Sequence, residues 1–315
     1  MTGTHYPLVF VDVSWLAYRA RYAMDGLSFD DMPTGVLFGV FEQLRTICLD
    51  GKVNSNRLHM FFDSKQSFRR KAYPEYKRGR RADPTPEEQQ VADMMHDQIR
   101  LLRRKIFPSI GLPCYMQSGL ESDDLIAEAA RKIPGSETAI IITADQDLYQ
   151  CISDLVSWYN PASDSWMGVL NLWRHKDIDP SMWARVKAIA GCTTDNVQGV
   201  PGVGEKTAIE HILGRLNPEY KRAKAIVTAE GKRIIRRNLK LVRLPHAKTT
   251  PFKLQKTEWS AKAFRKMCEQ YGFESYTRDP LISQWQTIFA GEIAASERIW
   301  NQPKPPKTRK RGKKR

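Results

Sequence analysis

Residues 139–149 have the sequence AIIITADQDLY, in which a short apolar run is followed closely by two acids. The run Ala139–Ile142 is typical of a buried parallel strand. Two more runs have the same form: LVFV at 8–11 precedes Asp12, and LHMFF at 58–62 precedes Asp63. Helical apolar patterns lie between the strands, from about 86 to 107 and again from about 121. This alternation predicts an α/β fold, with a central, mostly parallel sheet flanked by helices.

Each of the three predicted strands is followed by an aspartate. The carboxyl ends of parallel strands meet at one edge of a sheet, where ligand sites form. Two carboxylates about 4 Å apart repel by roughly 4 kcal/mol at an effective dielectric near 20, so a cluster requires cations or raised pKa values. Oxygen ligands without histidine or cysteine favour Mg²⁺, with Mn²⁺ as the alternative. Such a site suits two-metal phosphodiester hydrolysis, whereas the competing interpretation is a set of solvated helix caps and turns. The predicted metal ligands are Asp12, Asp63, Glu121, Asp123, Asp124, Asp145, Asp147 and Asp195.

The composition favours a polyanionic partner. The chain has 315 residues and a net charge of +15, of which the last twelve residues contribute eight Lys or Arg and no acid. Without that tail the charge is still +7, so the folded part is basic as well. Five scattered cysteines predict reduced thiols in a cytoplasmic protein and no structural zinc. No apolar segment is long enough for a membrane span, and the N-terminus is predicted to be the first strand rather than a signal peptide.

Two segments carry features that suit DNA. Residues 68–81 combine seven basic residues with aromatic rings, and cations can contact phosphates while rings stack on bases. Residues 199–204 have the sequence GVPGVG, which offers backbone N–H groups at the start of a helix, with Lys206 close by. A nucleotide P-loop is excluded, because Glu205 stands where that motif needs lysine. A solvated loop and a plain tight turn are the competing interpretations of these two segments.

The predicted organisation has four parts. Residues 1–178 are predicted to form an α/β nuclease domain that carries the basic segment. Residues 179–255 are predicted to form a helical DNA-binding subdomain that carries the glycine hairpin. Residues 256–300 form a helical extension, whose contacts with DNA, a polymerase or the protein's own core the sequence leaves open. Residues 301–315 form a disordered basic tail.

Several motifs occur together in one order. They are Asp12 with LAYR at 16–19; FD at 62–63 with FR at 68–69; YK at 76–77 with GR at 79–80; ESDD at 121–124; TADQDLY at 143–149; and the segment 191–207. In this order the chain resembles the 5′-nuclease (flap endonuclease) family, which includes bacteriophage 5′–3′ exonucleases and the 5′-nuclease domain of bacterial DNA polymerase I. The resemblance covers roughly residues 8–245.

The resemblance implies a PIN-like fold and specific residue roles. Asp12, Asp63, Glu121 and Asp123 would surround one metal, Asp124 would lie near both ions, and Asp145, Asp147 and Asp195 would serve the second. Arg19, Lys77 and Arg80 would engage the scissile phosphate or the 5′ strand. The glycine hairpin would grip duplex phosphates and hold a K⁺ ion. The remaining implied DNA contacts are Tyr18, Arg69, Arg70, Tyr76, Gly199, Gly202, Gly204, Lys206 and Thr207.

The resemblance also implies an activity. Family members cut 5′ flaps or 5′ single-stranded ends of DNA, and many remove RNA from RNA–DNA hybrids. It further implies a basic helical arch at about 69–90 in the α/β nuclease domain, and a DNA-binding subdomain of the helix-hairpin-helix type at 179–255. The expected protein is a stand-alone monomer in a bacterium or a phage-infected cell, associated with the nucleoid. It would act in replication or repair, for example in primer or flap removal.

One position departs from the family pattern. Cys192 stands where an aspartate is expected, and a thiol is a soft ligand that matches Mg²⁺ poorly. The second metal is therefore expected to bind more weakly. Two alternative functions remain open at this point: a catalytically weak or inactive branched-DNA-binding protein, and a PIN-like ribonuclease.

Overall fold

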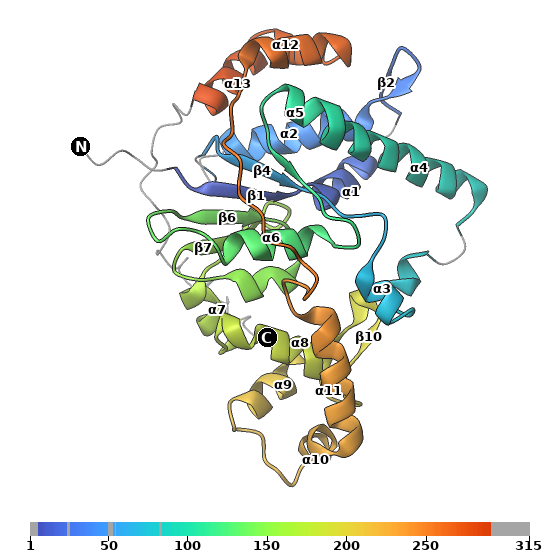
Figure 1. Ribbon diagram of the computed structural model, residues 1–315, viewed down its shortest axis with the longest axis vertical. Helices are drawn as coiled ribbons and strands as arrows, with labels where there is room; N and C mark the ends of the chain where they lie inside the picture. Colours follow the sequence, from blue (N-terminus) through green and yellow to red (C-terminus); the bar gives the residue numbers. More distant parts are fainter. Residues whose placement is uncertain (1–5, 24–25, 50–52, 54, 82–83, 291–315) are drawn as a thin grey trace, which may run out of the picture.

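A six-stranded sheet forms the centre of the protein. The computed structural model describes residues 6–23, 26–49, 53, 55–81 and 84–290 (Figure 1). The strand order is β5-β4-β1-β6-β7-β8, with β8 antiparallel to β7 and every other pair parallel. The strands are β1 (Leu8–Asp12), β4 (Leu58–Phe61), β5 (Cys114–Tyr115), β6 (Ala139–Ile142), β7 (Val156–Asn160) and β8 (Ser165–Met167). The predicted mostly parallel sheet and its three central strands are confirmed.

The central strands are apolar throughout because both faces of the sheet are covered. Every residue of β1, β4 and β6 is buried. Successive side chains of a strand point to opposite faces. Accordingly, Val9 and Val11 belong to one hydrophobic cluster, whereas Leu8 and Phe10 belong to another.

Helices cover the two faces (Figure 1). The cluster on the first face takes side chains from α1, α2, α4, α5, α12 and α13, and the cluster on the second face takes them from α6 to α11. The bounds of the first set are α1 (Val13–Ala23), α2 (Gly35–Leu49), α4 (Pro86–Leu101), α5 (Phe107–Ser109), α12 (Ala261–Gln270) and α13 (Leu281–Ala290). Those of the second set are α6 (Ser122–Ala130), α7 (Val169–Lys176), α8 (Trp183–Ala190), α9 (Glu205–Ile212), α10 (Lys221–Val227) and α11 (Ala229–Val242).

The C-terminal helices pack on the same core as the sheet. Phe264 on α12 and Trp285 on α13 are buried, and both rings contact Phe41 on α2. Tyr276 donates a hydrogen bond of 2.9 Å to Glu42 of α2. The described part of the region after residue 256, up to residue 290, therefore completes the hydrophobic layer on the first face, and residues 291–300 lie outside the described residues. The basic tail at 301–315 lies outside the described residues.

A tight turn in the helical region depends on glycine. Gly191 has a φ of +82°, and a Cβ there would lie 2.4 Å from the nitrogen of Gly199. The two short strands β9 (Gly191–Cys192) and β10 (Val197–Gln198) pair at this point. Asn238 of α11 holds the turn by donating to the carbonyls of Ala188 and Gln198, each at 2.9 Å.

The predicted arch begins with α3 (Phe68–Ala72), continues through a 3-10 helix (Arg78–Arg81) and reaches α4 at Pro86. Residues 82–83, between these elements, lie outside the described residues. The division of the chain at 178/179 stays a prediction, and apolar side chains from both sides of it share the second cluster. Across the ranges given above, no helix has the length and hydropathy that crossing a bilayer requires.

Candidate metal centre

Three of the predicted acids meet where the central strands end. Asp12 ends β1, and its two carboxylate oxygens accept hydrogen bonds from Ser122 (3.1 Å) and Thr143 (3.0 Å). Asp63 follows β4 and accepts from the backbone N–H of Ser122 at 2.8 Å. The start of α6 therefore lies against the ends of β1 and β4, which places Asp123 at the same edge.

The electrostatics of this group call for a cation. Burial, and then the charge of Asp63, raise the pKa of Asp12 to about 7. Burial, followed by the charges of Asp145 and Asp12, holds the pKa of Asp123 well above its ordinary range. Carboxylates that repel one another in this way are stabilised by a divalent ion. Asp63 is exposed and Asp123 is partly exposed, so an ion can reach them from solvent.

Glu121 is held by two residues of the predicted arch, Tyr76 and Lys77. It precedes α6, and its Oε2 accepts hydrogen bonds from Lys77 Nζ and from the Tyr76 hydroxyl, both at 2.9 Å. Burial alone would raise the pKa of Glu121, but Lys77 and Arg69 hold it below the usual value. The ammonium of Lys77 also lies near enough to Asp123 to oppose the rise of its pKa.

Asp124 does not belong to this open group. Its side chain is 0% exposed, and Arg69 grips it with two hydrogen bonds of 2.6 and 2.7 Å. The backbone N–H groups of His246 (2.7 Å) and Glu121 (3.2 Å) complete its shell. The prediction that Asp124 serves as a metal ligand is wrong, because both of its oxygens are already bound by protein donors.

Two predicted DNA contacts are also wrong. Arg69 is 3% exposed and, besides Asp124, donates from Nε to the carbonyl of Leu241 at 2.6 Å. Tyr76 is equally buried, and its hydroxyl lies 2.9 Å from Glu121 and 3.2 Å from Asp195. Both side chains face inward, where they connect the predicted arch to the acids at the sheet edge and to the helical region. Neither can reach a nucleic acid.

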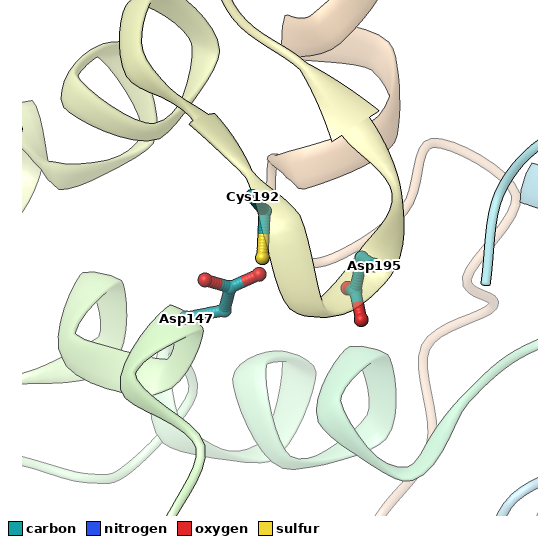
Figure 2. A group of neighbouring side chains, drawn as sticks. All are labelled: Asp147, Cys192 and Asp195. Atoms are coloured by element: carbon teal, nitrogen blue, oxygen red, sulfur yellow. The ribbon is translucent and has the colours of Figure 1, made fainter. Parts of the chain in front are cut away.

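A second group of ligands comprises Asp147, Cys192 and Asp195 (Figure 2). Asp147, Cys192 and Asp195 each offer one atom, and these atoms lie within 4.8 Å of one another; no other described residues form such a compact set. Asp147 belongs to a 3-10 helix (Gln146–Cys151), whereas Cys192 and Asp195 flank the turn after β9. Asp145 caps that 3-10 helix by accepting from the Asp147 N–H at 2.8 Å.

A lysine that the sequence did not single out completes this second group. Lys187 of α8 places its Nζ 3.0 Å from Oδ1 of Asp147. Burial, and then the charge of Asp145, raise the pKa of Asp147 to about 6, while Lys187 opposes that rise. Burial, followed by the charges of Asp147 and Asp195, raises the pKa of Cys192, so this residue is a thiol at neutral pH. Lys187 precedes Cys192 by five residues in a basic chain, and only the packing of α8 distinguishes it from other lysines.

The remaining predicted contacts differ in exposure. Tyr18 is 47% exposed, and exposed Arg19 stacks over the ring of Trp15 at 5.0 Å. Arg70 is partly exposed, and the side chain of Arg80 lies outside the described part. The predicted hairpin contacts Gly202, Gly204 and Lys206 are exposed, and Gly199 is partly exposed.

Thr207 is buried at the start of α9. Its side chain is therefore not available to DNA, and its predicted contact, through the backbone at the start of the helix, stays a prediction.

Known proteins share this sequence pattern. The sequence model of the family described as 5′-3′ exonuclease, N-terminal resolvase-like domain, matches residues 7–178. DNA polymerase I of Rhizobium leguminosarum is 30% identical over 253 residues, which cover 77% of this chain and 24% of that protein. The 5′-3′ exonuclease of Buchnera aphidicola subsp. Schizaphis graminum is 30% identical over 206 residues, which cover 64% of this chain and 68% of that protein. The chain thus spans about a quarter of the length of the polymerase relative.

Solved structures share the fold. The T5 5′-exonuclease with bound zinc has a TM-score of 0.62 at 22% identity, covering 76% of this chain and 90% of that one. The bacteriophage T5 flap endonuclease, in a complex with DNA and metal ions, has a TM-score of 0.61 at 19% identity, covering 90% and 98%. With the extent of the family match and the identity to the Buchnera protein, these likenesses lead to one conclusion: the chain belongs to the 5′-3′ exonuclease family.

Proposed function

We propose that the protein is a metal-dependent 5′ nuclease that hydrolyses phosphodiester bonds near 5′ ends or flaps of DNA, in replication or repair. The observation that carries the proposal is the set of acids at the ends of β1 and β4. Asp12 and Asp63 are tied together through Ser122, and the raised pKa values of Asp12 and Asp123 indicate carboxylates that need a cation.

The first group fits Mg²⁺. Asp12, Asp63 and Asp123 offer only oxygen, and they are spaced more widely than the second group. Mg²⁺ keeps several of its own waters and binds proteins through a few carboxylates, so a wide, oxygen-only set suits it. When bound, such an ion lowers the pKa of a water and stabilises charge on the phosphate oxygens. Glu121 holds Lys77 at this edge, where the ammonium can bind the scissile phosphate.

The substrate in this proposal is DNA with a 5′ flap or a 5′ single-stranded end. Exposed Arg19 on α1 and partly exposed Arg70 on α3 offer accessible cations, and Tyr18 offers an exposed ring. α11 adds exposed Arg233, Arg236 and Lys240. Cations of this kind supply the sequence-independent part of DNA affinity.

Further details rest on the family resemblance. The proposal includes a second cation at Asp147 and Asp195 in two-metal catalysis, a K⁺ ion at the glycine hairpin, RNA–DNA hybrids as a further substrate, and a monomer acting in the cytoplasm on nucleoid DNA.

A second candidate function follows from Cys192. If the thiol prevents loading of the second group, the protein would bind branched DNA and cut it slowly or not at all. The same chain would then protect or mark a junction rather than process it.

Cleavage of a 5′-labelled flap duplex in Mg²⁺ tests the proposal. We expect cleavage by the unaltered chain and none by Asp123→Asn. The matched control is Asp154→Asn, since Asp154 is an exposed acid just before β7, at the opposite edge of the sheet. Tight flap binding without cleavage in Mg²⁺ or Mn²⁺ would refute the enzyme and leave the binding protein.

A further inference from the structure

The two ligand groups of the site differ in chemistry. The first contains oxygen donors alone, whereas the second combines a thiol with two carboxylates (Figure 2). We propose that Asp147, Cys192 and Asp195 bind a thiophilic divalent cation of the zinc class. The first group would then bind Mg²⁺ and the second group a different metal. The inference rests on the proposed function, because it assigns the second cation of that site.

The geometry of the second group suits direct coordination. The three donor atoms lie within 4.8 Å of one another and all three residues are buried. Figure 2 shows the Sγ of Cys192 directed at the carboxylate of Asp147, with Asp195 on the other side of the same turn. Zn²⁺ takes sulfur and oxygen ligands in tetrahedral sites, and its catalytic sites use three protein ligands and one open position. A compact set of one sulfur and two oxygens matches that requirement after a small contraction.

Mg²⁺ does not fit the same group. It demands near-octahedral oxygen coordination and gives up its waters reluctantly, whereas Cys192 offers a soft atom. Lys187 adds a second obstacle, because its ammonium lies 3.0 Å from Oδ1 of Asp147 and already neutralises part of that charge. A thiophilic cation gains binding free energy from its bond to sulfur, and this gain offsets the weaker electrostatic attraction. A hard cation has no such compensation here.

Binding must release a proton. The S–H bond of Cys192 breaks as the sulfur–metal bond forms, and the proton passes to the solvent. Lys187 keeps its contact with Oδ1 while Oδ2 of Asp147 donates to the metal. One proton should therefore leave for each cation bound, with no change of oxidation state.

Cadmium provides a direct probe, because a cadmium–thiolate bond absorbs in the ultraviolet. Titrating the full chain with Cd²⁺ in the presence of excess Mg²⁺ should produce a thiolate-to-metal absorption band that saturates at about one ion per chain. Cys192→Ser should abolish the band and weaken Zn²⁺ binding, measured by competition, at least about tenfold. The matched control is Cys151→Ser, which alters another thiol near the acids and should keep the band.

Three results would overturn the inference: no band in the unaltered chain, the same band in Cys192→Ser, or loss of the band when Mg²⁺ is added. The first needs no variant, so a variant that fails to fold leaves the test intact. Flap cleavage is measured in parallel. Asp123→Asn should lose cleavage and keep the band, so a failed nuclease and a failed thiophilic site give different outcomes.

Discussion

The buried pair of Arg69 and Asp124 allows a quantitative test of how the arch is anchored. The guanidinium makes two hydrogen bonds to the carboxylate, at 2.6 and 2.7 Å, and a third to the Leu241 carbonyl at 2.6 Å. The side chains are 3% and 0% exposed, so solvent hardly screens the pair. Arg69→Met removes the cation and leaves the carboxylate buried with only backbone donors. Breaking a buried ion pair from one side costs about 3–5 kcal/mol, and we expect the free energy of unfolding to fall by that amount.

Urea denaturation of the metal-free protein measures this loss, and the melting temperature should drop by roughly 6–15 °C. The control is Arg70→Met, at the next residue along α3, whose side chain is partly exposed and is not one of the donors to Asp124 described above. It should cost less than about 1 kcal/mol. The double variant Arg69→Met with Asp124→Leu should regain most of the loss, because it removes the uncompensated charge. If Arg69→Met costs no more than Arg70→Met, the argument that this pair anchors the arch is refuted.

Three further predictions concern the acids and the turn. In the metal-free protein, the free energy of unfolding should fall as pH rises from about 4 to about 7. The reason is that the folded-state pKa of Asp12 is raised from 3.8 to about 7, so its stabilising contribution is lost as the carboxyl ionises. Melting curves recorded in chelator at pH 5 and pH 8 measure this fall, and Asp12→Asn should reduce it. Tyr76→Phe should cost about 1–3 kcal/mol in urea, since it removes the single hydroxyl donor that the buried carboxylates of Glu121 and Asp195 share. An unchanged midpoint would contradict the placement of the hydroxyl. Gly191→Ala should destabilise the protein more than Gly202→Ala. Both positions have positive φ, but only at Gly191 would the added Cβ lie 2.4 Å from backbone. Equal losses of stability in urea would show that backbone strain, and not the steric clash, causes the effect.

The strands and the acids at their ends could be predicted from sequence because both depend on short segments. A strand buried on both faces has to be apolar at every position, so β1, β4 and β6 stand out without any knowledge of their neighbours. Since parallel strands end at a common edge, an acid after each strand is enough to predict a cluster. The edge strands β5 and β8 and the inner strand β7 were not predicted.

The inward or outward direction of individual side chains could not be predicted. Arg69 and Arg70 are adjacent basic residues in a basic segment, yet one is locked under the arch and the other is partly exposed. Asp123 and Asp124 are adjacent acids, yet one joins the open group and the other fills a buried pair. Each outcome depends on α11 and the segment after it, more than a hundred residues away, which supply Leu241 and His246.

The sequence by itself determined the α/β architecture, the edge at which acids collect and the substitution at Cys192, because periodicity, strand ends and residue type are local properties. Only the tertiary structure decided that Lys187 meets Asp147, that Tyr76 joins Glu121 to Asp195, and that the thiol lies within reach of two carboxylates. Electrostatic interactions and coordination depend on distance in space, and the folding of α8 and its turn onto the sheet sets those distances.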